Sequence, residues 1–214
     1  TLSRRSTHLD VALHRVHADE PIHLVIDSTG LSIVGEGEWA AVTHGGSGKR
    51  GWKKLHLGVD GGGAIVAQVL TQGSADDAVI ALGLIEDIAD DIASVTADAA
   101  YDTIAIYRAG DARGARVVVP PLKSATVPRG RSLSRARDRT VKRVKEIGRR
   151  RWKVESGYHA QARVENTFFR YKSIIGDRLR ARCQEAPEAE AVIACNILNR
   201  MTALGTPASH AVGA

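Results

Sequence analysis

The order of strand-like and helix-like segments limits the folds that this chain can adopt. Five segments have the apolar, β-branched or alternating pattern of strands, and they are 22–27, 54–59, 64–70, 93–97 and 115–119. The first three come without a helical pattern between them, and the turn 60–63 makes a hairpin of the second and third. Helix and strand alternate afterwards. The sequence therefore predicts an α/β fold with a mixed five-stranded sheet, which is the order of an RNase H-like fold.

A doubly wound nucleotide-binding fold is the alternative, but it needs a helix between the first two strands. The stretch 35–51 is instead rich in glycine and charge, and we interpret it as a loop. The run Ser28-Thr29-Gly30 predicts a turn that ends the first strand. A capping box at Ser74 and Asp77 opens a helical segment that runs to about residue 89. The other helical segments are a short helix after Asp102, about 136–150, 157–175 and 187–203.

A chain of 214 residues is long enough for one sizeable core and short for two. We divide it into a polar helical remnant at 1–20, one domain at 21–205 with a basic loop and helix inserted at 122–156, and a disordered tail at 206–214. No apolar run approaches the roughly 20 residues that cross a bilayer. Cys183 and Cys195 fit no redox or zinc motif, and the start of the chain is no secretory signal, so we expect a cytoplasmic protein without a membrane partner.

Positive charge is concentrated in one part of the sequence. The net charge is +6, and twelve Arg and Lys residues lie between 129 and 153, against Asp138 and Glu146. A solvated helix normally mixes charges of both signs, so this stretch repels itself unless a polyanion approaches. It favours nucleic-acid contact, with Arg143 and Arg150 among the candidate residues, and a merely solvated face is the alternative.

Three carboxylates stand where they can point at one place. Asp27 ends the first strand, Asp98 ends the fourth, and Glu165 lies in a late helical segment. Hard oxygen ligands of this kind suit divalent cations such as Mg²⁺. Taken singly, each acid also has a simple structural explanation, as a turn, a helix cap or a surface residue. For three other acids we keep that simpler interpretation, namely a turn for Asp60, a helix N-terminus for Asp77 and a helix N-cap for Asp102.

The helix predicted over 157–175 gives Glu165 a specific setting. At 100° per residue, Tyr158 and Lys172 lie within about 20° of its direction, and Gln161 joins the same row. A second row is apolar and suits the core, and its members are Val164, Phe168, Tyr171 and Ile175. The first row, which holds a phenol, an amide, a carboxylate and an ammonium, can hold a metal and a phosphate backbone together.

At these residues the sequence resembles the catalytic part of bacterial insertion-sequence transposases of the DDE (Asp-Asp-Glu) type, in the branch named after insertion sequence five. The resemblance spans nearly the whole chain, and its motifs lie at 25–30, 35–39, 52–57, 97–102, 157–159, 164–166, 170–172, 176–182 and 198–201. The family signature Tyr-x2-Arg-x3-Glu-x6-Lys is the most specific of them, and it falls on Tyr158, Gln161, Glu165 and Lys172.

The resemblance implies an RNase H-like catalytic domain and metal-dependent transposition of DNA. Asp27, Asp98 and Glu165 are then the catalytic acids and the ligands of two Mg²⁺ ions, for which Mn²⁺ can substitute. A phosphodiester bond at the transposon end is cut, and the freed 3′-hydroxyl attacks target DNA without a covalent protein–DNA intermediate. A homodimer on DNA is implied as well. Residues expected to contact DNA are Tyr158, Gln161, Lys172, Lys53, Lys54, Arg143 and Arg150, and for Trp52 and His56 core packing is an equal alternative.

The sequence departs from the family pattern at two points. Gln161 stands where the family has Arg, which removes a guanidinium that could bind a phosphate in a bidentate manner. Asp27 also comes early, where family members have a longer helical region before it. The alternatives are therefore a truncated, noncatalytic DNA-binding remnant, or a metal nuclease without strand transfer. A phosphate loop at Gly45-Gly46-Ser47-Gly48-Lys49 is disfavoured, because Thr43 and Arg50 replace two of the residues that it needs.

Overall fold

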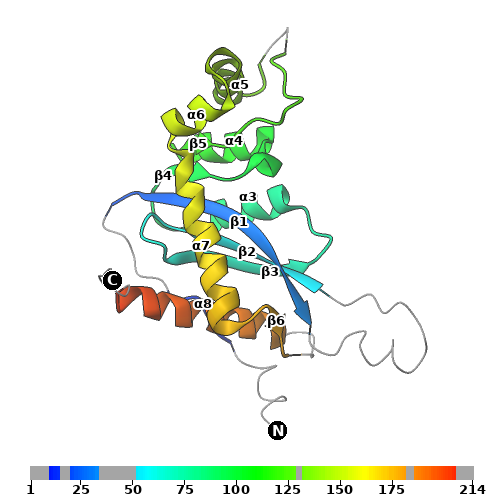
Figure 1. Ribbon diagram of the computed structural model, residues 1–214, viewed down its shortest axis with the longest axis vertical. Helices are drawn as coiled ribbons and strands as arrows, with labels where there is room; N and C mark the ends of the chain where they lie inside the picture. The colour runs from blue at the N-terminus through cyan, green and yellow to red at the C-terminus, as the bar shows by residue number, and fades with distance from the viewer. Residues whose placement is uncertain (1–9, 15–19, 34–51, 129–131, 182–185, 206–214) are drawn as a thin grey trace, which may run out of the picture.

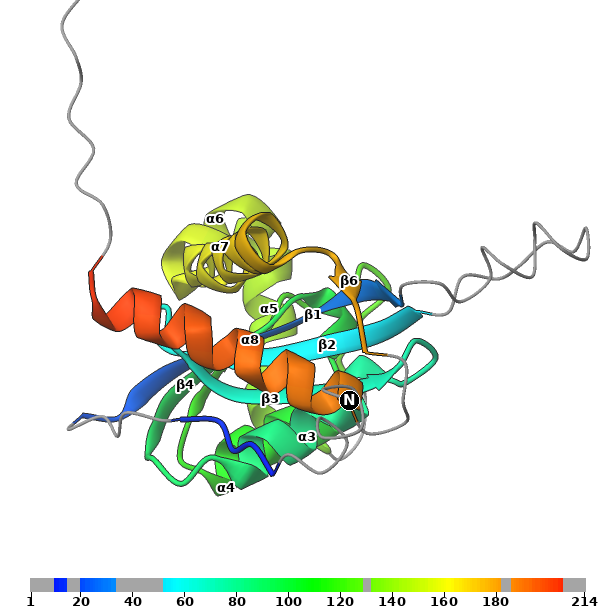
Figure 2. The same ribbon diagram turned by 90° about the horizontal axis from the view of Figure 1, so that it is seen from below.

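The computed structural model describes residues 10–14, 20–33, 52–128, 132–181 and 186–205. They form a mixed β-sheet with helices on both of its faces (Figures 1 and 2). The predicted α/β class is confirmed, with one short strand more than the five expected. Within these described residues, no helix is long and apolar enough to cross a bilayer.

The sheet is built around its first strand, β1 (Ile22–Ile33). The other strands are β2 (Trp52–Val59), β3 (Ile65–Gln72), β4 (Ile92–Thr96), β5 (Arg116–Val118) and β6 (Arg178–Leu179). Five of the six follow the order β3-β2-β1-β4-β5, antiparallel among the first three and parallel from β1 to β5. This is the predicted arrangement, in which a meander is followed by crossovers.

One edge of β1 is only partly paired. On one side β2 pairs with β1 from Val25 to Ser32. On the other side β4 pairs with it as far as Val25, and β6 pairs with it at Ser32 and Ile33. Between these two partners, no described strand pairs with residues 26–31 on that side. We call this stretch the open edge of β1, and it begins next to Asp27.

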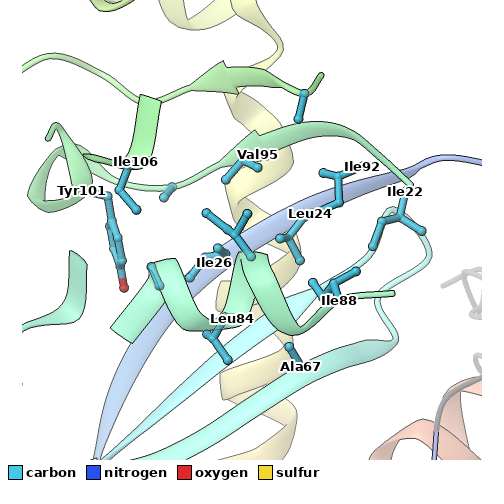
Figure 3. Packing of buried hydrophobic residues seen from close by; sticks show 14 of the residues in the cluster. Ile22, Leu24, Ile26, Ala67, Leu84, Ile88, Ile92, Val95, Tyr101 and Ile106 are labelled. Atoms are coloured by element: carbon cyan, nitrogen blue, oxygen red, sulfur yellow. The ribbon is translucent and has the colours of Figure 1, made fainter. Parts of the chain in front are cut away.

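Two helices, α3 (Asp77–Asp87) and α4 (Ile104–Ala112), cover the first face of the sheet (Figure 2). Leu24 and Ile26 of β1 and Val95 of β4 point to this face and pack against Leu84 of α3 (Figure 3). The next residue along β1, Val25, lies in the core cluster of the other face, as the alternation of a strand requires. The central strands are therefore buried on both sides.

The second face is covered by α7 (Ala162–Arg170) and α8 (Ala186–Ala203). Val164, Phe168 and Tyr171 are buried and Ile175 packs against the same cluster, so the predicted apolar row is confirmed. Residues 10–14 are not helical, unlike the helix predicted over 1–20. They lie along α8, where Asn196 donates from Nδ2 to the carbonyl of Ala12 (3.0 Å) and accepts at Oδ1 from the His14 N–H (2.7 Å).

The basic segment forms two helices, α5 (Arg135–Ile147) and α6 (Arg149–Ser156), beyond the β5 edge of the sheet (Figure 1). We call residues 132–156 the α5–α6 lobe. One helix was predicted over 136–150, but it ends at Gly148, whose φ of 81° lies outside the helical region. Glycine accepts that conformation without a steric penalty, and the turn brings the buried Trp152 into the lobe.

Other boundaries also differ from the prediction, because the chain pairs over longer distances than local patterns reveal. Ser28, Thr29 and Gly30 continue β1 instead of forming a turn, since they pair with residues 54–56 of β2. The N-cap of α3 is Asp76, whose carboxylate accepts from the N–H groups of Ala78 and Val79, so the Ser74–Asp77 capping box is wrong.

The helix predicted over 157–175 changes its winding twice. It starts as a 3₁₀ turn, η2 (Tyr158–Gln161), continues as α7 and ends as a π-helical turn, η3 (Tyr171–Ile175). The wide last turn is closed by the N–H of Gly176, which donates to the carbonyl of Tyr171 (3.1 Å). A constant 100° per residue therefore does not describe this segment, and the row of side chains predicted from it must be placed anew.

Candidate active site

Asp27 lies on β1 where the strand loses its β4 partner. It points to the same face as Val25, that of α7, and it is half-buried. Its Oδ1 accepts a hydrogen bond from the N–H of Ser28 (2.8 Å). Within the described residues its Oδ2 accepts none, so one carboxylate oxygen is available to a ligand.

Asp98 follows the neighbouring strand β4 and caps the 3₁₀ turn η1 (Ala99–Tyr101). Its Oδ1 accepts from the N–H of Ala100 (2.7 Å). Val25 and Thr96 are the last paired residues of the parallel strands β1 and β4, and Asp27 and Asp98 each follow two residues later. The two acids therefore lie at the same level of adjacent strands, but only β4 ends there, because β1 continues past Asp27 to Ile33. Ligands of open α/β sheets commonly bind outside such carboxyl ends of strands.

Glu165 comes from α7, which lies across β1 and β2 on the second face (Figure 1). Val164 and Thr167 hold this helix on the sheet, because both are almost completely buried. The Glu165 side chain itself is exposed. It can therefore change its rotamer without disturbing the core.

The three predicted acids are linked by their charges. Burial raises the pKa of Asp27 to about 6, and the hydrogen bond from Ser28 counteracts it. The negative charges of Asp98, Glu165 and Asp77 raise this pKa further. Three carboxylates thus raise the pKa of a fourth carboxylate, that of Asp27, and no positively charged group lowers it. Such a site is stabilised by protons or by a metal ion.

The donor set fits a hard cation. In proteins Mg²⁺ is commonly held by one or two carboxylates and completed by water and substrate phosphates, and Asp27 and Asp98 supply two carboxylates. Among the described residues, however, no group of three or more His, Cys, Asp or Glu side chains is close enough together to hold a metal ion. The acids therefore share an electrostatic environment here without forming a closed three-ligand cage.

Tyr158 lies beside these acids. Partial burial raises its pKa to about 12, and Asp98, Glu165 and Asp27 raise it further, so the phenol keeps its proton at neutral pH. Its ring is fixed by Lys153, whose Nζ lies 4.5 Å from the ring centroid, and by the neighbouring Trp152 ring at 6.4 Å. Lys172 lies in the π-helical turn η3 and is exposed.

Gln161 does not stand on an exposed row. The 3₁₀ winding of η2 places it in the interior, 4% exposed, and neither amide atom has a hydrogen-bond partner. An unpaired buried amide costs about 1–3 kcal/mol. Gln161 was predicted to share one row with Glu165 because regular α-helical geometry was assumed. The 3₁₀ turn η2 does not have this geometry.

The predicted DNA contacts on β2 are engaged within the protein. Lys53 is buried and lies 3.6 Å from Glu188. Lys54 points to the opposite face, where its Nζ donates to Asp77 Oδ1 (3.0 Å) and to the Ala75 carbonyl. His56 is also buried, and Asp77 lies 3.6 Å from its ring. Core packing is therefore the better interpretation of His56, and Trp52 next to Lys53 is about half exposed.

Asp102 is not the N-cap of a helix, because Thr103 caps α4. Its carboxylate instead accepts two hydrogen bonds from Arg137 of α5, at 2.7 and 2.8 Å. It also accepts from the N–H of Leu122 (2.8 Å), and its side chain is completely buried. This pair joins the loop that follows Asp98 to the α5–α6 lobe.

Inside the lobe, the two candidate DNA contacts differ. Arg143 binds Glu155 through Nε and Nη2 and Glu146 through Nη1, each at 2.8 Å. Arg150 is exposed and has no ion pair within the described residues. Arg150 is therefore available to a polyanion, whereas the charge of Arg143 is already balanced.

Two residues near the acids escaped the sequence analysis in this role. The negative charge of Asp77, which lies on α3, raises the pKa of Asp27. From the sequence, Asp77 was assigned only to the start of a helix. Tyr101 is buried at the edge of the first core (Figure 3), and its hydroxyl has no hydrogen bond of good geometry. Burial and the charges of Asp27, Asp77 and Asp98 raise its pKa far above the ordinary value. Tyr101 follows Asp98 by three residues, and this short spacing was the sequence signal that could have placed it near the acids.

Several predicted features lie outside the described residues. They are most of the segment 1–20, the loop 35–51 with the motif 35–39 and the glycine run 45–48, Arg129, Arg131, Cys183 and the tail 206–214.

Comparison with known proteins gives one family. A family model described as the transposase DDE domain matches residues 18–200, which is most of the 214-residue chain. The matched range contains Asp27, Asp98 and Glu165. No solved structure matches the chain.

Proposed function

The chain belongs to the transposase DDE domain family, and on that premise we propose that it cuts DNA at an insertion-sequence end and joins it to a target. Asp27, Asp98 and Glu165 are the proposed catalytic acids and Mg²⁺ ligands. The observation that carries this assignment is the pKa of Asp27, which burial raises to about 6 and which Asp98 and Glu165 raise further. Acids from three separate parts of the chain are brought into electrostatic contact at the open edge of β1.

We expect two Mg²⁺ ions in the active complex, with Mn²⁺ as a substitute. Held by these acids, such ions would supply stabilisation of negative charge on the phosphate and activation of the attacking water or 3′-hydroxyl. Asp27 and Asp98 supply the ligands that are fixed by the sheet. Glu165 is exposed on α7, so we propose that its carboxylate turns to join them when DNA is bound.

The remaining residues position the DNA. Tyr158 stays protonated at neutral pH, so its hydroxyl can donate to a phosphate oxygen beside the acids. Lys172 is an exposed cation one to two helical turns beyond Glu165. Exposed cations of the α5–α6 lobe, Arg150 among them, would add nonspecific phosphate contacts that weaken with salt. From family membership alone, we further propose that two copies assemble on DNA and act in the cytoplasm.

Cleavage of DNA that carries the element's own ends tests the assignment. In Mg²⁺ buffer the chain should nick this DNA, and EDTA should abolish the nick. Asp98→Asn should lower the cleavage rate at least about 100-fold, because even the outer-shell partners of metal sites are worth 10–100-fold. Asp91→Asn is the matched control, since Asp91 is exposed and precedes the same strand β4. Undiminished cleavage by Asp98→Asn would rule out the site.

The products separate transposition from simple hydrolysis. A transposase first hydrolyses a phosphodiester bond at the end, which frees a 3′-hydroxyl. That hydroxyl then attacks a target phosphodiester, so that one P–O bond forms and one breaks. Joined end–target strands on a denaturing gel therefore support strand transfer. Nicked ends without joined strands identify a metal nuclease.

A noncatalytic DNA-binding protein is the second candidate, and the unpaired buried amide of Gln161 favours it. The family has Arg at this position. Gln161→Arg should raise cleavage if the chain is an enzyme weakened at this residue. Gln161→Met is the matched control, because it keeps the apolar packing without adding a charge. DNA binding by all three proteins with cleavage by none would favour the noncatalytic candidate.

A further inference from the structure

A small cavity lies beside the start of α7, next to the acids. It measures about 210 Å³ and lies between the strands β1, β4 and β5 and the start of α7. Its polar lining residues are His23, Ser94, Thr96, Arg116, Ser156, His159 and Arg163. Arg163 precedes Glu165 by two residues, which corresponds to about 200° around an α-helix, so these two side chains leave α7 in nearly opposite directions. Val25 and Thr96 also line the cavity, so it lies next to Asp27 and Asp98 without containing any of the three acids.

Several of the lining groups have defined positions. His23 Nδ1 and the buried hydroxyl of Ser94 are 2.8 Å apart, so the ring is tied to β4. Arg116 donates from Nη2 to the carbonyl of Ser156 (2.9 Å). Its guanidinium passes close to Gly157, where a Cβ atom would lie 3.9 Å from Nη2. The cavity is thus preformed on the strand side.

The charged residues that line the cavity, Arg116 and Arg163, are both positive. No Asp or Glu is among the described residues that line it. Arg163 has no side-chain hydrogen bond or ion pair within the described residues, and the only side-chain partner of Arg116 there is a neutral carbonyl. Neither guanidinium group has a negatively charged partner within the described residues. This is the reverse of Arg143, which is held by two carboxylates.

We propose that this cavity binds a phosphate group. Planar guanidinium groups bind phosphate oxygens in pairs, and the hydroxyls of Ser94 and Thr96 and the imidazole of His23 offer further hydrogen bonds. The phosphate can come from a DNA backbone or from a free phosphate compound. Val25 and Thr96 line the cavity and precede Asp27 and Asp98 by two residues each, roughly 7 Å along a strand, so the cavity is a neighbour of the acids. The groups that carry the inference are the two arginines, the hydroxyls and the imidazole, none of which is a proposed catalytic acid.

Thermal unfolding of the full chain in metal-free buffer tests phosphate binding. Inorganic phosphate should raise the melting temperature above that in sodium chloride of equal ionic strength, because a ligand of the folded state stabilises it. Arg163→Gln should weaken phosphate binding about tenfold or more, since it removes a charge-assisted contact. It should fold normally, because Arg163 holds no other residue in place. Arg108→Gln, at an exposed position of α4, is the matched control and should keep the wild-type response.

DNA binding distinguishes the two sources of the phosphate. If a DNA backbone fills the cavity, Arg163→Gln should weaken binding of duplex DNA and lower its salt slope by about 1, whereas Arg108→Gln should not. If a free phosphate compound is the ligand, Arg163→Gln loses the response to inorganic phosphate and keeps wild-type DNA affinity. The proposal is overturned if inorganic phosphate has no effect on the wild-type protein and Arg163→Gln binds DNA like the wild type. Asp98→Asn should retain phosphate binding, so this result is independent of cleavage.

Discussion

The open edge of β1 and the α5–α6 lobe both contain concentrated charge, but they balance it differently. At the open edge, the charges of Asp98 and Glu165 raise the pKa of Asp27, and no cation is among the causes that lower it. In the lobe, Arg143 is bonded to two glutamates, and Arg137 is bonded to the buried Asp102. The acids of the open edge have no ion pair within the described residues, whereas the lobe pairs two of its arginines internally.

Two aspartates four residues apart illustrate the difference. Asp98 and Asp102 flank the 3₁₀ turn η1, but only Asp102 has an arginine partner. Charge that is paired and buried holds elements together, whereas like charges left together in one place are typical of functional sites. The sequence motif 97–102 contains both aspartates, so sequence alone does not distinguish the structural acid from the candidate catalytic one.

The largest expected effect comes from breaking the paired acid. Asp102→Ala leaves the Arg137 guanidinium and the Leu122 N–H without their partner, so the free energy of unfolding should fall by about 3–5 kcal/mol. Urea denaturation of the variant and the wild type measures this. Asp98→Ala is the control from the same loop, and it should cost only about 1 kcal/mol, because it removes just the cap on the Ala100 N–H. A loss below about 1 kcal/mol for Asp102→Ala would contradict the structural role.

The unpaired acid Asp27 should make the stability of the folded protein depend on pH. The folded-state pKa of Asp27 is about 6, above its ordinary value of 3.8, so the folded protein binds a proton that the unfolded chain releases. The stability from this proton is complete below pH 3.8 and is lost as the pH rises through 6, by up to about 3 kcal/mol. Asp27→Asn should remove this loss, so that the free energy of unfolding of the variant rises relative to that of the wild type between pH 4 and 7. Parallel stability curves over that range would contradict the assigned environment.

A smaller effect separates the two arginines of the lobe. Arg150→Gln should weaken binding of duplex DNA and lower the salt slope by about 1, because one free phosphate contact is lost. Arg143→Gln should change DNA affinity less, because Glu146 and Glu155 already balance that charge. Fluorescence anisotropy in a salt series compares them. If Arg143→Gln has the larger effect, the internal pairing of Arg143 does not persist on DNA.

Local patterns were sufficient to predict most of the fold. The five main strands and the helices that cover them were expected, because alternating or amphipathic apolar residues report directly on burial. The pairing of Ser28-Thr29-Gly30 with β2 was missed, since these residue types favour turns and only a distant strand overrides that preference. The two-residue strand β6 has no local pattern at all.

The candidate site was predictable in part from local patterns. Asp27 and Asp98 follow the ends of apolar runs, but the prediction that Asp27 ends the first strand was wrong, because β1 continues to Ile33. The burial of Gln161 was missed because the angular count assumed a uniform helix. Arg137 lies 35 residues from Asp102, so nothing local connects them. Glu155 lies just beyond the basic stretch that was counted, and a wider window would have indicated a partner for Arg143.

The turn Tyr171–Ile175 closes its hydrogen bond five residues back, so it holds one residue more than an α-helical turn. Removing that extra residue would let the turn tighten while α7 and its anchor in the core stayed unchanged. The Lys172 side chain would then point in a new direction around the helix axis, whereas the Glu165 side chain would keep its direction. Length variation at this one turn can therefore re-aim the cation independently of the acid.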